Sequence, residues 1–375
     1  MKMQDYVRYS ATKLKENFDN RNELVGPISR IFKNGNYQSF TLIASGSSYN
    51  SLLMVKDALQ ELSRLPVYLY TPEHVEECNC ALWSNTFVII VSQSGSSTNI
   101  ISCQKYLLQR KISFVSLTGN IHSPMADYST NIFDYGVGNE YVDYVTMGVQ
   151  TLVEYFLLFA NNINTLSESR KSAFGEQLLK AIEDQPGLLK TTEEFLKQNH
   201  FALAMNNPTF FCGNGPNLGV AKEGALKFQE TLKRPAMYYE LEEFLHGPDI
   251  QLTPNYTVFL IDDMVQKKHV RFHEVFTALK EVTPNVFLIT SSSQIEQDRR
   301  VVKTSAVNNW ILSLYYSLPV IQLVAAKMAD ELNTWPPHSY FDRFDKKIAI
   351  KTANYDQELI EIKQKWQLEN HNKTN

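Results

Sequence analysis

Cysteine is scarce in this sequence, and no segment has the composition of a leader peptide. Four cysteines in 375 residues form no CxxC pair and no zinc-binding framework. So few thiols suit a reducing compartment better than a disulfide-bonded secreted protein. The amino terminus has no apolar core of the signal-peptide type, and we find no apolar run of membrane-spanning length. We therefore expect a cytoplasmic protein that has no membrane partner.

Glycine (15 residues) and proline (14 residues) are also few, whereas hydrophobic residues make up 43% of the chain. This composition excludes extensive disorder and supplies a sizeable core. The net charge of −4 argues against a broad nucleic-acid-binding surface. The stretch "GNGPNLG" (213–219) resembles a glycine-rich nucleotide loop only weakly, so we expect no cofactor. The length allows two ordinary domains or one large α/β unit.

Short apolar segments of strand length alternate with longer segments of helical periodicity. The strand candidates are 40–44, 67–70, 86–91, 112–117, 209–212, 257–262 and 285–290. The clearest helical stretches are 49–62, 99–109 and 218–232. Continuous apolar strands that alternate with amphipathic helices are typical of parallel sheets covered on both faces. The pattern predicts an α/β fold.

The chain also contains an internal repeat. At an offset of 167 residues, Gly46 pairs with Gly213 and Asn50 with Asn217. The strands on either side of these pairs recur in the same order. We therefore expect two copies of one α/β unit, joined by the polar helical segment 164–199.

Two turns of the first copy are rich in hydroxyl groups. The segment 92–98, "SQSGSST", follows a buried strand, and the segment 44–50, "ASGSSYN", follows another. The carboxyl ends of neighbouring parallel strands meet at one edge of a sheet, and the amino ends of helices favour anions. Either turn alone could be an ordinary capped turn, but the pair predicts an anion site. The second copy has Asp262 and Asp263 at the corresponding turn, where carboxylates would repel an anion.

These motifs resemble those of a known family. The run "SGSSYNS" followed by "SQSGSSTN" is similar to the sugar-isomerase (SIS) phosphosugar-binding domain. The run "AKEGALKFQE" followed by "EEFLHGP" is similar to the second SIS domain of the isomerase half of glucosamine-6-phosphate synthase and of fructosamine-6-phosphate deglycases. The resemblance covers about residues 35 to 350 and implies two doubly wound parallel-sheet SIS domains in tandem, with N-terminal helices. The expected parts are a helical segment at 1–34, SIS domains at 35–190 and 191–350, and a tail at 351–375.

The resemblance also implies which residues contact the substrate, a small sugar phosphate. The expected phosphate-binding and substrate-binding residues are Ser47, Ser48, Ser92, Gln93, Ser94, Ser97 and Lys227. Ser97 stands where the family usually has a threonine, and Met147 stands where the synthase has a lysine, so the substrate side can differ.

Three further residues match positions with catalytic roles in the family. Glu230 matches the glutamate that moves a proton between sugar C1 and C2. His246 matches the histidine of ring opening, which in the family reaches the neighbouring subunit's site, so we expect a homodimer or higher homo-oligomer. Lys347 falls near the Schiff-base lysine of the carboxyl terminus, and Lys346 is an equal candidate.

The reaction that the resemblance implies is the breakdown of a 6-phosphorylated amino sugar or Amadori compound by a deglycase or deaminase. The chain begins at Met1 and leaves no room for a glutaminase domain, so we do not expect the full synthase reaction. The alternatives are an aldose–ketose isomerase and a non-catalytic phosphosugar sensor. A carboxylate and an imidazole suit acid–base chemistry at neutral pH, so Glu230 and His246 favour an enzyme.

The pair His269 and His273 has the i,i+4 spacing of helical metal ligands. No third ligand is evident from the sequence. We therefore expect a solvated helix face and no metal site.

Overall fold

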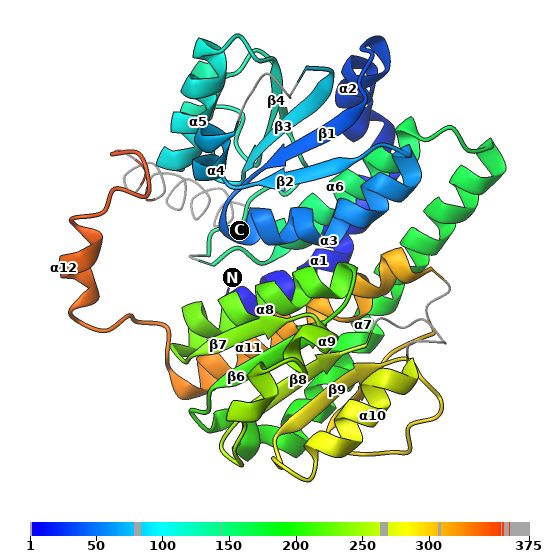
Figure 1. Ribbon diagram of the computed structural model, residues 1–375, viewed down its shortest axis with the longest axis vertical. Helices are drawn as coiled ribbons and strands as arrows, with labels where there is room; N and C mark the ends of the chain where they lie inside the picture. The colour runs from blue at the N-terminus through cyan, green and yellow to red at the C-terminus, as the bar shows by residue number, and fades with distance from the viewer. Residues whose placement is uncertain are drawn as a thin grey trace, which may run out of the picture.

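Two parallel five-stranded sheets organise the chain, one in each half (Figure 1). The computed structural model describes residues 2–78, 84–142, 144–262, 269–306, 309–353, 355 and 360. The first sheet has the order β2 (Val67–Tyr70), β1 (Ser39–Ile43), β3 (Thr86–Ser92), β4 (Phe114–Thr118) and β5 (Ile132–Asp134). The second has the order β7 (Ala236–Tyr239), β6 (Thr209–Gly213), β8 (Thr257–Ile261), β9 (Val286–Thr290) and β10 (Val301–Lys303).

The same strand order in both sheets confirms the tandem α/β fold, but the offset of 167 residues is wrong. Strand β1 begins at residue 39 and β6 at residue 209, which are 170 residues apart. Gly46 is the first residue of helix α3 (Gly46–Ser63), whereas Gly213 is the last residue of β6. In both halves two residues connect the first strand to the helix that follows it. The alignment that pairs Gly46 with Gly213 therefore shifts the second repeat by three residues relative to the structural match.

All seven strands predicted from apolar runs are present, and all except the edge strand β2 are buried on both faces. Strand β3 is buried at every position, which explains its continuous apolar sequence. Strands β5, β7 and β10 were not predicted. Each has only three or four residues and lies at the edge of a sheet, where the sequence carries little periodic signal; the edge strand β2 is equally short, but it was predicted.

A layer of helices separates the two sheets (Figure 1). It consists of α3, α6 (Met147–Ile163), α8 (Pro216–Leu232) and α11 (Leu318–Leu332), and α3 packs directly against α8. One hydrophobic core runs through this layer and includes buried residues of both halves, such as Leu52 and Phe228. Smaller cores lie on the outer faces, under α5 (Thr98–Gln109) in the first half and α10 (His269–Leu279) in the second.

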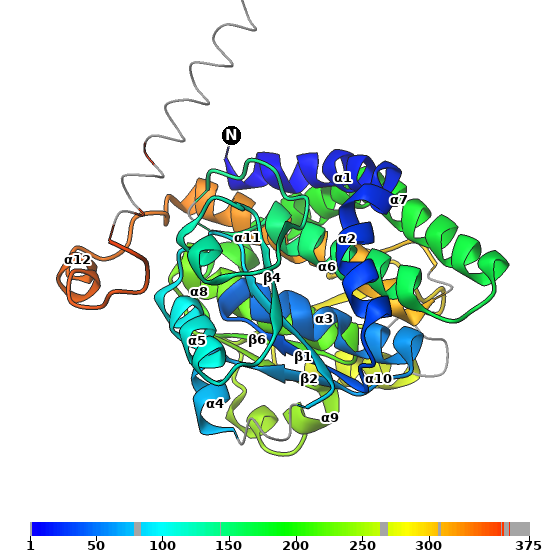
Figure 2. The ribbon, with the colours of Figure 1, turned by 90° about the horizontal axis from the view of Figure 1, so that it is seen from above.

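Long helices hold the two halves together. The amino terminus forms α1 (Met3–Asp19) and α2 (Arg21–Asn34), and α1 packs against both α6 and α7 (Glu168–Ala204). Figure 2 shows α1 and α7 side by side along one flank of the molecule. Helix α7 is the polar connection expected between the repeats, and the expected domain boundary at 190–191 falls inside it.

One segment contradicts the expectation that no apolar run is long enough to span a membrane. The stretch Trp310–Leu332 is 23 residues long, and its most apolar 18-residue window has a mean hydropathy of 1.4, so by length and composition it could cross a membrane. It comprises a 3₁₀ helix (Trp310–Tyr316) and α11, and 94% of its most apolar window is buried inside the protein. Its apolar character is therefore explained by its place in the shared core.

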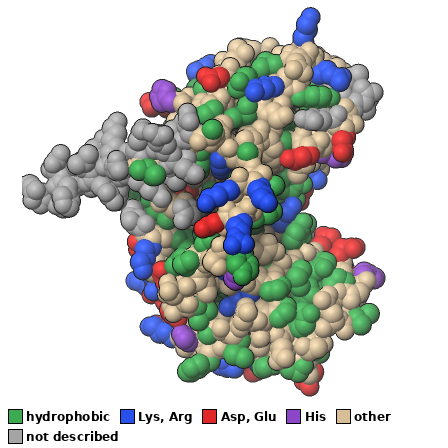
Figure 3. All heavy atoms as spheres, turned by 90° about the vertical axis from the view of Figure 1, so that its left-hand side faces the viewer, with side chains coloured by type: hydrophobic (Ala, Val, Ile, Leu, Met, Phe, Trp, Pro, Cys, Tyr) green, Lys and Arg blue, Asp and Glu red, His purple; other side chains and the backbone are tan. Residues whose placement is uncertain are grey.

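Short helices complete the chain. They are α4 (Pro72–Glu77), α9 (Leu241–Phe244), α12 (Phe341–Asp345) and two 3₁₀ helices, Pro124–Tyr128 and Pro248–Gln251. Helix α12 is exposed throughout and stands apart from the body of the molecule in Figure 1. Figure 3 shows lysine and arginine side chains gathered near the middle of the face that carries this segment. Of the expected tail at 351–375, only 351–353, 355 and 360 are among the described residues.

Candidate active site

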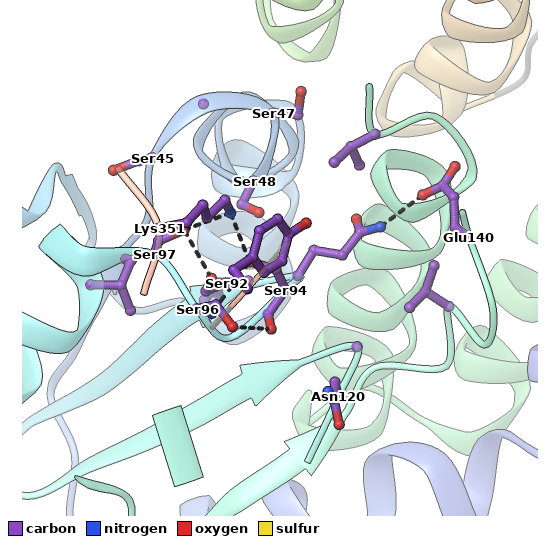
Figure 4. Close-up of a pocket in the computed structure, with 18 of the residues that line it drawn as sticks. Ser45, Ser47, Ser48, Ser92, Ser94, Ser96, Ser97, Asn120, Glu140 and Lys351 are labelled. Atoms are coloured by element: carbon purple, nitrogen blue, oxygen red, sulfur yellow. Dashed lines mark hydrogen bonds between the residues drawn. The ribbon is translucent and has the colours of Figure 1, made fainter. Parts of the chain in front are cut away.

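A cavity of about 1030 Å³ lies where the first sheet's strands β1 and β3 end (Figure 4). Both hydroxyl-rich turns line it, as the sequence predicts. The lining includes Ser45, Gly46, Ser47 and Ser48 from the first turn and Ser92, Gln93, Ser94, Ser96, Ser97 and Thr98 from the second. The carboxyl ends of parallel strands therefore carry the site, as in other open α/β folds.

The turn between β3 and α5 depends on Gly95, whose φ of +63° lies in the left-handed region. A Cβ atom there would lie 1.8 Å from the Ser123 Oγ atom, so any side chain would force the turn to open. The Gly95 backbone N–H donates to the Ser92 Oγ atom at 3.2 Å, which fixes the serine at the end of the strand. The turn is thus held in the shape that presents its hydroxyls to the cavity.

Lys351 supplies a positive charge to this turn from the far end of the chain. Its Nζ atom donates to the Ser94 Oγ at 2.8 Å and to the Ser97 Oγ at 3.2 Å (Figure 4). The lysine is held by an antiparallel bridge between Ser97 and Lys351, flanked by the bond from the Thr98 backbone N–H to the Ile350 carbonyl, 3.2 Å. Among the described residues that line the cavity, Lys351 is the one lysine or arginine. It therefore offers the countercharge that a bound phosphate needs.

Gln93 is oriented by a buried carboxylate. Its Nε2 atom donates to the Glu140 Oε2 at 2.8 Å, and its Oε1 accepts from the Tyr135 hydroxyl at 2.9 Å. Glu140 also accepts backbone N–H bonds from Thr146, Met147 and Gly148 at 2.5–3.0 Å, at the amino end of α6. The carboxylate thus caps the helix and aims Gln93 at the cavity.

The second half contributes a charged group on the face of α8 that meets α3. Lys227 is fully buried and its Nζ atom lies 3.2 Å from the Glu223 Oε1 and 2.8 Å from the Glu230 Oε2. The Glu223 carboxylate also accepts from the Ser47 Oγ at 3.0 Å and from the Asn50 Nδ2 at 2.7 Å. Glu230 keeps 27% of its side chain exposed and lines the cavity. A carboxylate from the second half therefore faces a site built mainly by the first.

Burial controls the proton affinities of these groups. Burial raises the pKa of Glu230 above its ordinary value, although Lys227 acts in the opposite direction. Burial by itself would lower the pKa of the Lys227 amine, but the Glu223 and Glu230 carboxylates outweigh it and raise that pKa. Lys227 is therefore a fixed cation. Burial lowers the pKa of Lys351 below that of an exposed lysine.

The predicted site residues separate into three groups in the structure. Ser47, Ser48, Ser92, Gln93, Ser94, Ser97 and Glu230 all line the cavity. Lys227 lies buried behind Glu230 and holds its carboxylate. His246 and Lys347 are exposed, and neither lines this cavity.

Among the carboxy-terminal lysines, the structure places Lys351 in the cavity, whereas Lys346 and Lys347 are exposed. The sequence reasoning missed Lys351 and Glu140. Lys351 belongs to the same "KKIAIKT" segment as the two predicted lysines. What sets it apart from them is its backbone bridge to Ser97, which the sequence does not show. Met147, where the synthase has a lysine, is buried as the first residue of α6 and leaves no cation at that position.

The expectation of a solvated face for His269 and His273 is wrong. His269 is buried and His273 retains 14% exposure of its side chain. Asp262, which is fully buried, contacts the ring of His269. Asp262 is therefore the third member of this cluster. From the sequence it was interpreted only as a carboxylate that would repel an anion.

Comparisons with known proteins agree with this architecture. The SIS domain model matches residues 37–160. Glutamine–fructose-6-phosphate aminotransferase of Clostridium tetani is 25% identical over 246 residues, which are 64% of this chain and 40% of that protein. The enzyme of the same name from Acinetobacter baylyi is 25% identical over 313 residues, 78% of this chain and 49% of that protein. The chain thus spans less than half the length of these relatives.

Solved structures share the fold across nearly the whole chain. A protein of Clostridium difficile 630, provisionally named a phosphosugar isomerase, has a TM-score of 0.83 at 23% identity and covers 92% of this chain and 98% of its own. The C-terminal domain of glucosamine-fructose-6-phosphate aminotransferase from Francisella tularensis has a TM-score of 0.73 at 17% identity, covering 87% and 96%. Tagatose-6-phosphate ketose/aldose isomerase of Escherichia coli has a TM-score of 0.71 at 15% identity, covering 88% and 94%.

Proposed function

Since the chain is a tandem SIS-domain protein homologous to the isomerase domain of glucosamine-6-phosphate synthase, we propose that it is a deglycase or deaminase of a 6-phosphorylated ketoamine. The substrate class is the fructosamine 6-phosphate type. The observation that supports this most directly is the cavity with an anion-binding turn and Lys351 on one side and Glu230 on another.

The proposed reaction relocates two protons and consumes one water. Glu230 removes a proton from C1 of the ketoamine and returns it to C2. The amine nitrogen loses its N–H proton and the C2 oxygen gains one, so the C2 carbonyl becomes a hydroxyl and C1 becomes an imine. Water adds to the C1 imine, and the C1–N bond breaks to give an aldose 6-phosphate and a free amine. Lys227 holds the Glu230 carboxylate at 2.8 Å, and the hydroxyl turn with Lys351 anchors the phosphate.

The test is a panel of substrates given to the purified full chain. Fructosamine 6-phosphate, glucosamine 6-phosphate and fructose 6-phosphate are incubated separately, and released amine and aldose phosphate are quantified. Release of both products from the ketoamine, and its loss in Glu230→Gln, supports the proposal. Conversion of ketose to aldose without amine release would replace it with the isomerase reading, which uses the same proton transfer.

Binding of the same compounds, and of their unphosphorylated counterparts, is measured by titration calorimetry. The phosphorylated sugars should bind and the unphosphorylated sugars should not, since the countercharge lies at the phosphate position. Tight binding without turnover of any compound would favour a phosphosugar sensor. We further propose that the protein acts in the cytoplasm as a homo-oligomer in which His246 serves a neighbouring subunit's site.

A further inference from the structure

The second sheet carries a cluster of potential metal ligands at the edge that corresponds to the anion site. Asp262 directly follows β8, and His269 and His273 lie one turn apart at the start of α10. One ligand atom from each of the three residues lies within 4.8 Å of the others. Two histidines at i and i+4 on one helix face, joined by a carboxylate from another element, form the ligand set of many zinc sites.

The carboxylate of the cluster is held in place from several sides. The Asp262 backbone N–H donates to the Ile289 carbonyl at 3.1 Å, and its own carbonyl accepts from the Asn217 Nδ2 at 2.9 Å. The Thr290 hydroxyl donates to the Asp262 Oδ2 at 2.5 Å, and His269 Nδ1 contacts the same oxygen. Hydrogen bonds of this kind orient metal-binding carboxylates and raise their affinity.

His273 has a buried ring nitrogen whose polarity no hydrogen bond within the described part of the chain satisfies. Its Nε2 atom is buried and has no hydrogen-bond partner among the described residues, and it lies 4.0 Å from the Asp262 Oδ2. The rings of His269 and His273 stack with centroids 5.9 Å apart. A buried ring nitrogen without a partner costs free energy, and a coordinated cation would remove that cost.

We propose that Asp262, His269 and His273 bind one divalent transition-metal ion, Zn²⁺ by preference, with water in the remaining coordination position. Imidazole nitrogens suit Zn²⁺ and are poor ligands for Mg²⁺ and Ca²⁺. The ion joins α10 to the carboxyl end of β8 and stabilises the second half. None of the three residues lines the cavity of the first half, so the ion has a structural role.

The experiment titrates the chelator-stripped full chain with Zn²⁺ and, separately, with Co²⁺. We expect one ion per chain, a visible cobalt spectrum typical of nitrogen and oxygen ligands, and a higher melting temperature with Zn²⁺. An excess of Mg²⁺ should not displace the ion. Failure of the unmodified chain to bind Zn²⁺ or Co²⁺ stoichiometrically would overturn the proposal.

The decisive variant is His273→Asn, because the imidazole nitrogen that it removes has no hydrogen bond to lose in the metal-free protein. We expect its Zn²⁺ affinity to fall by about 100-fold or more. The matched control is His200→Asn, an exposed histidine 2.7 Å from Glu331, which should leave binding unchanged. Full binding by His273→Asn, or loss only in His200→Asn, would place the ion elsewhere. If His273→Asn does not fold, zinc-edge X-ray absorption on the unmodified chain decides, since fewer than two imidazole ligands would contradict the site.

Discussion

At the residue scale, Glu230 combines partial exposure with a fixed cationic partner. Its carboxylate faces the cavity, while Lys227 behind it is fully buried and doubly ion-paired. A base in this position can exchange a proton with a substrate without moving. The same residue therefore provides the sharpest kinetic prediction.

Replacing Glu230 with glutamine should lower turnover by about 10²–10⁴-fold, the usual contribution of a general base. Glutamine keeps the size of the side chain, and the proposed phosphate contacts are made by other residues, so the KM should change little. Steady-state kinetics and exchange of the substrate C1 proton with solvent measure the two effects. A Glu230→Gln protein with normal turnover would remove the residue from the mechanism.

The raised pKa of Glu230 predicts the pH dependence. The base must be ionised to accept a proton, so kcat/KM should fall as the pH decreases through that pKa. Burial places the fall at a higher pH than the ordinary glutamate value of 4.5 would. A pH profile of kcat/KM checks this, and an acid limb at or below the ordinary value would contradict it.

Lys351→Met should weaken binding of a 6-phosphorylated sugar by about 10- to 100-fold, since charge-assisted hydrogen bonds contribute more than neutral ones. Lys347→Met is the matched control, because Lys347 is exposed and outside the cavity. Calorimetric titration of both variants measures the difference. Equal losses in both variants would contradict a specific contact between Lys351 and the phosphate, and a loss confined to Lys347→Met would assign that contact to Lys347.

The two lysines also show the limit of inference from the sequence. The serines and Glu230 could be predicted because short motifs place them on strand-end turns and on one helix. Lys351 could not, because it reaches Ser94 and Ser97 through a backbone bridge across more than half of the chain. Glu140 was missed for a similar reason: three of its partners are backbone N–H groups and the fourth, Gln93, is 47 residues away, so the contacts leave no local pattern in the sequence.

At the element scale, the amino end of α6 relies on Glu140. Three backbone N–H groups that have no partner within the helix donate to this one carboxylate. The same carboxylate orients Gln93, so the helix end and the substrate site share a group. A change here should therefore affect stability and binding together.

Glu140→Ala should lower the free energy of unfolding by about 0.5–2 kcal/mol, the usual cost of losing a helix cap. It should also weaken phosphosugar binding, because Gln93 loses its partner. Glu194→Gln, on an exposed i,i+3 pair with Lys197, is the control and should change stability by less than about 0.5 kcal/mol. Urea unfolding with calorimetric titration tests both, and unchanged binding in Glu140→Ala would separate the two roles.

Elements differ in how far the sequence predicts them. Buried central strands such as β3 are continuous apolar runs and could be located within one or two residues. Edge strands were located less well: β2 was predicted, whereas β5, β7 and β10 were not, since three or four residues give little periodic signal. The repeat could be recognised, but its two copies could not be aligned correctly. Gly46 begins the helix after the connection, whereas Gly213 ends the strand before it.

At the scale of the whole molecule, His246 is exposed and lies outside the chain's own cavity. If it completes a neighbour's site, Glu230→Gln and His246→Ala proteins are each inactive alone. In equal mixtures of exchanging dimers, about one quarter of the wild-type activity should return, because one site in each mixed dimer has both groups. Activity of mixtures is measured after exchange is confirmed by mass. No recovery would mean that the histidine acts in its own chain or not at all.

The contact between the halves has a consequence for how such a chain can change over generations. Ser47 of the first repeat bonds to Glu223 and Lys227 of the second, and Glu230 closes a cavity that the first repeat builds. Cutting the gene between the repeats would separate the turn proposed to bind the phosphate from the carboxylate proposed to transfer the proton. Selection for the reaction therefore acts on both repeats as one inherited block, even though each is a complete α/β unit.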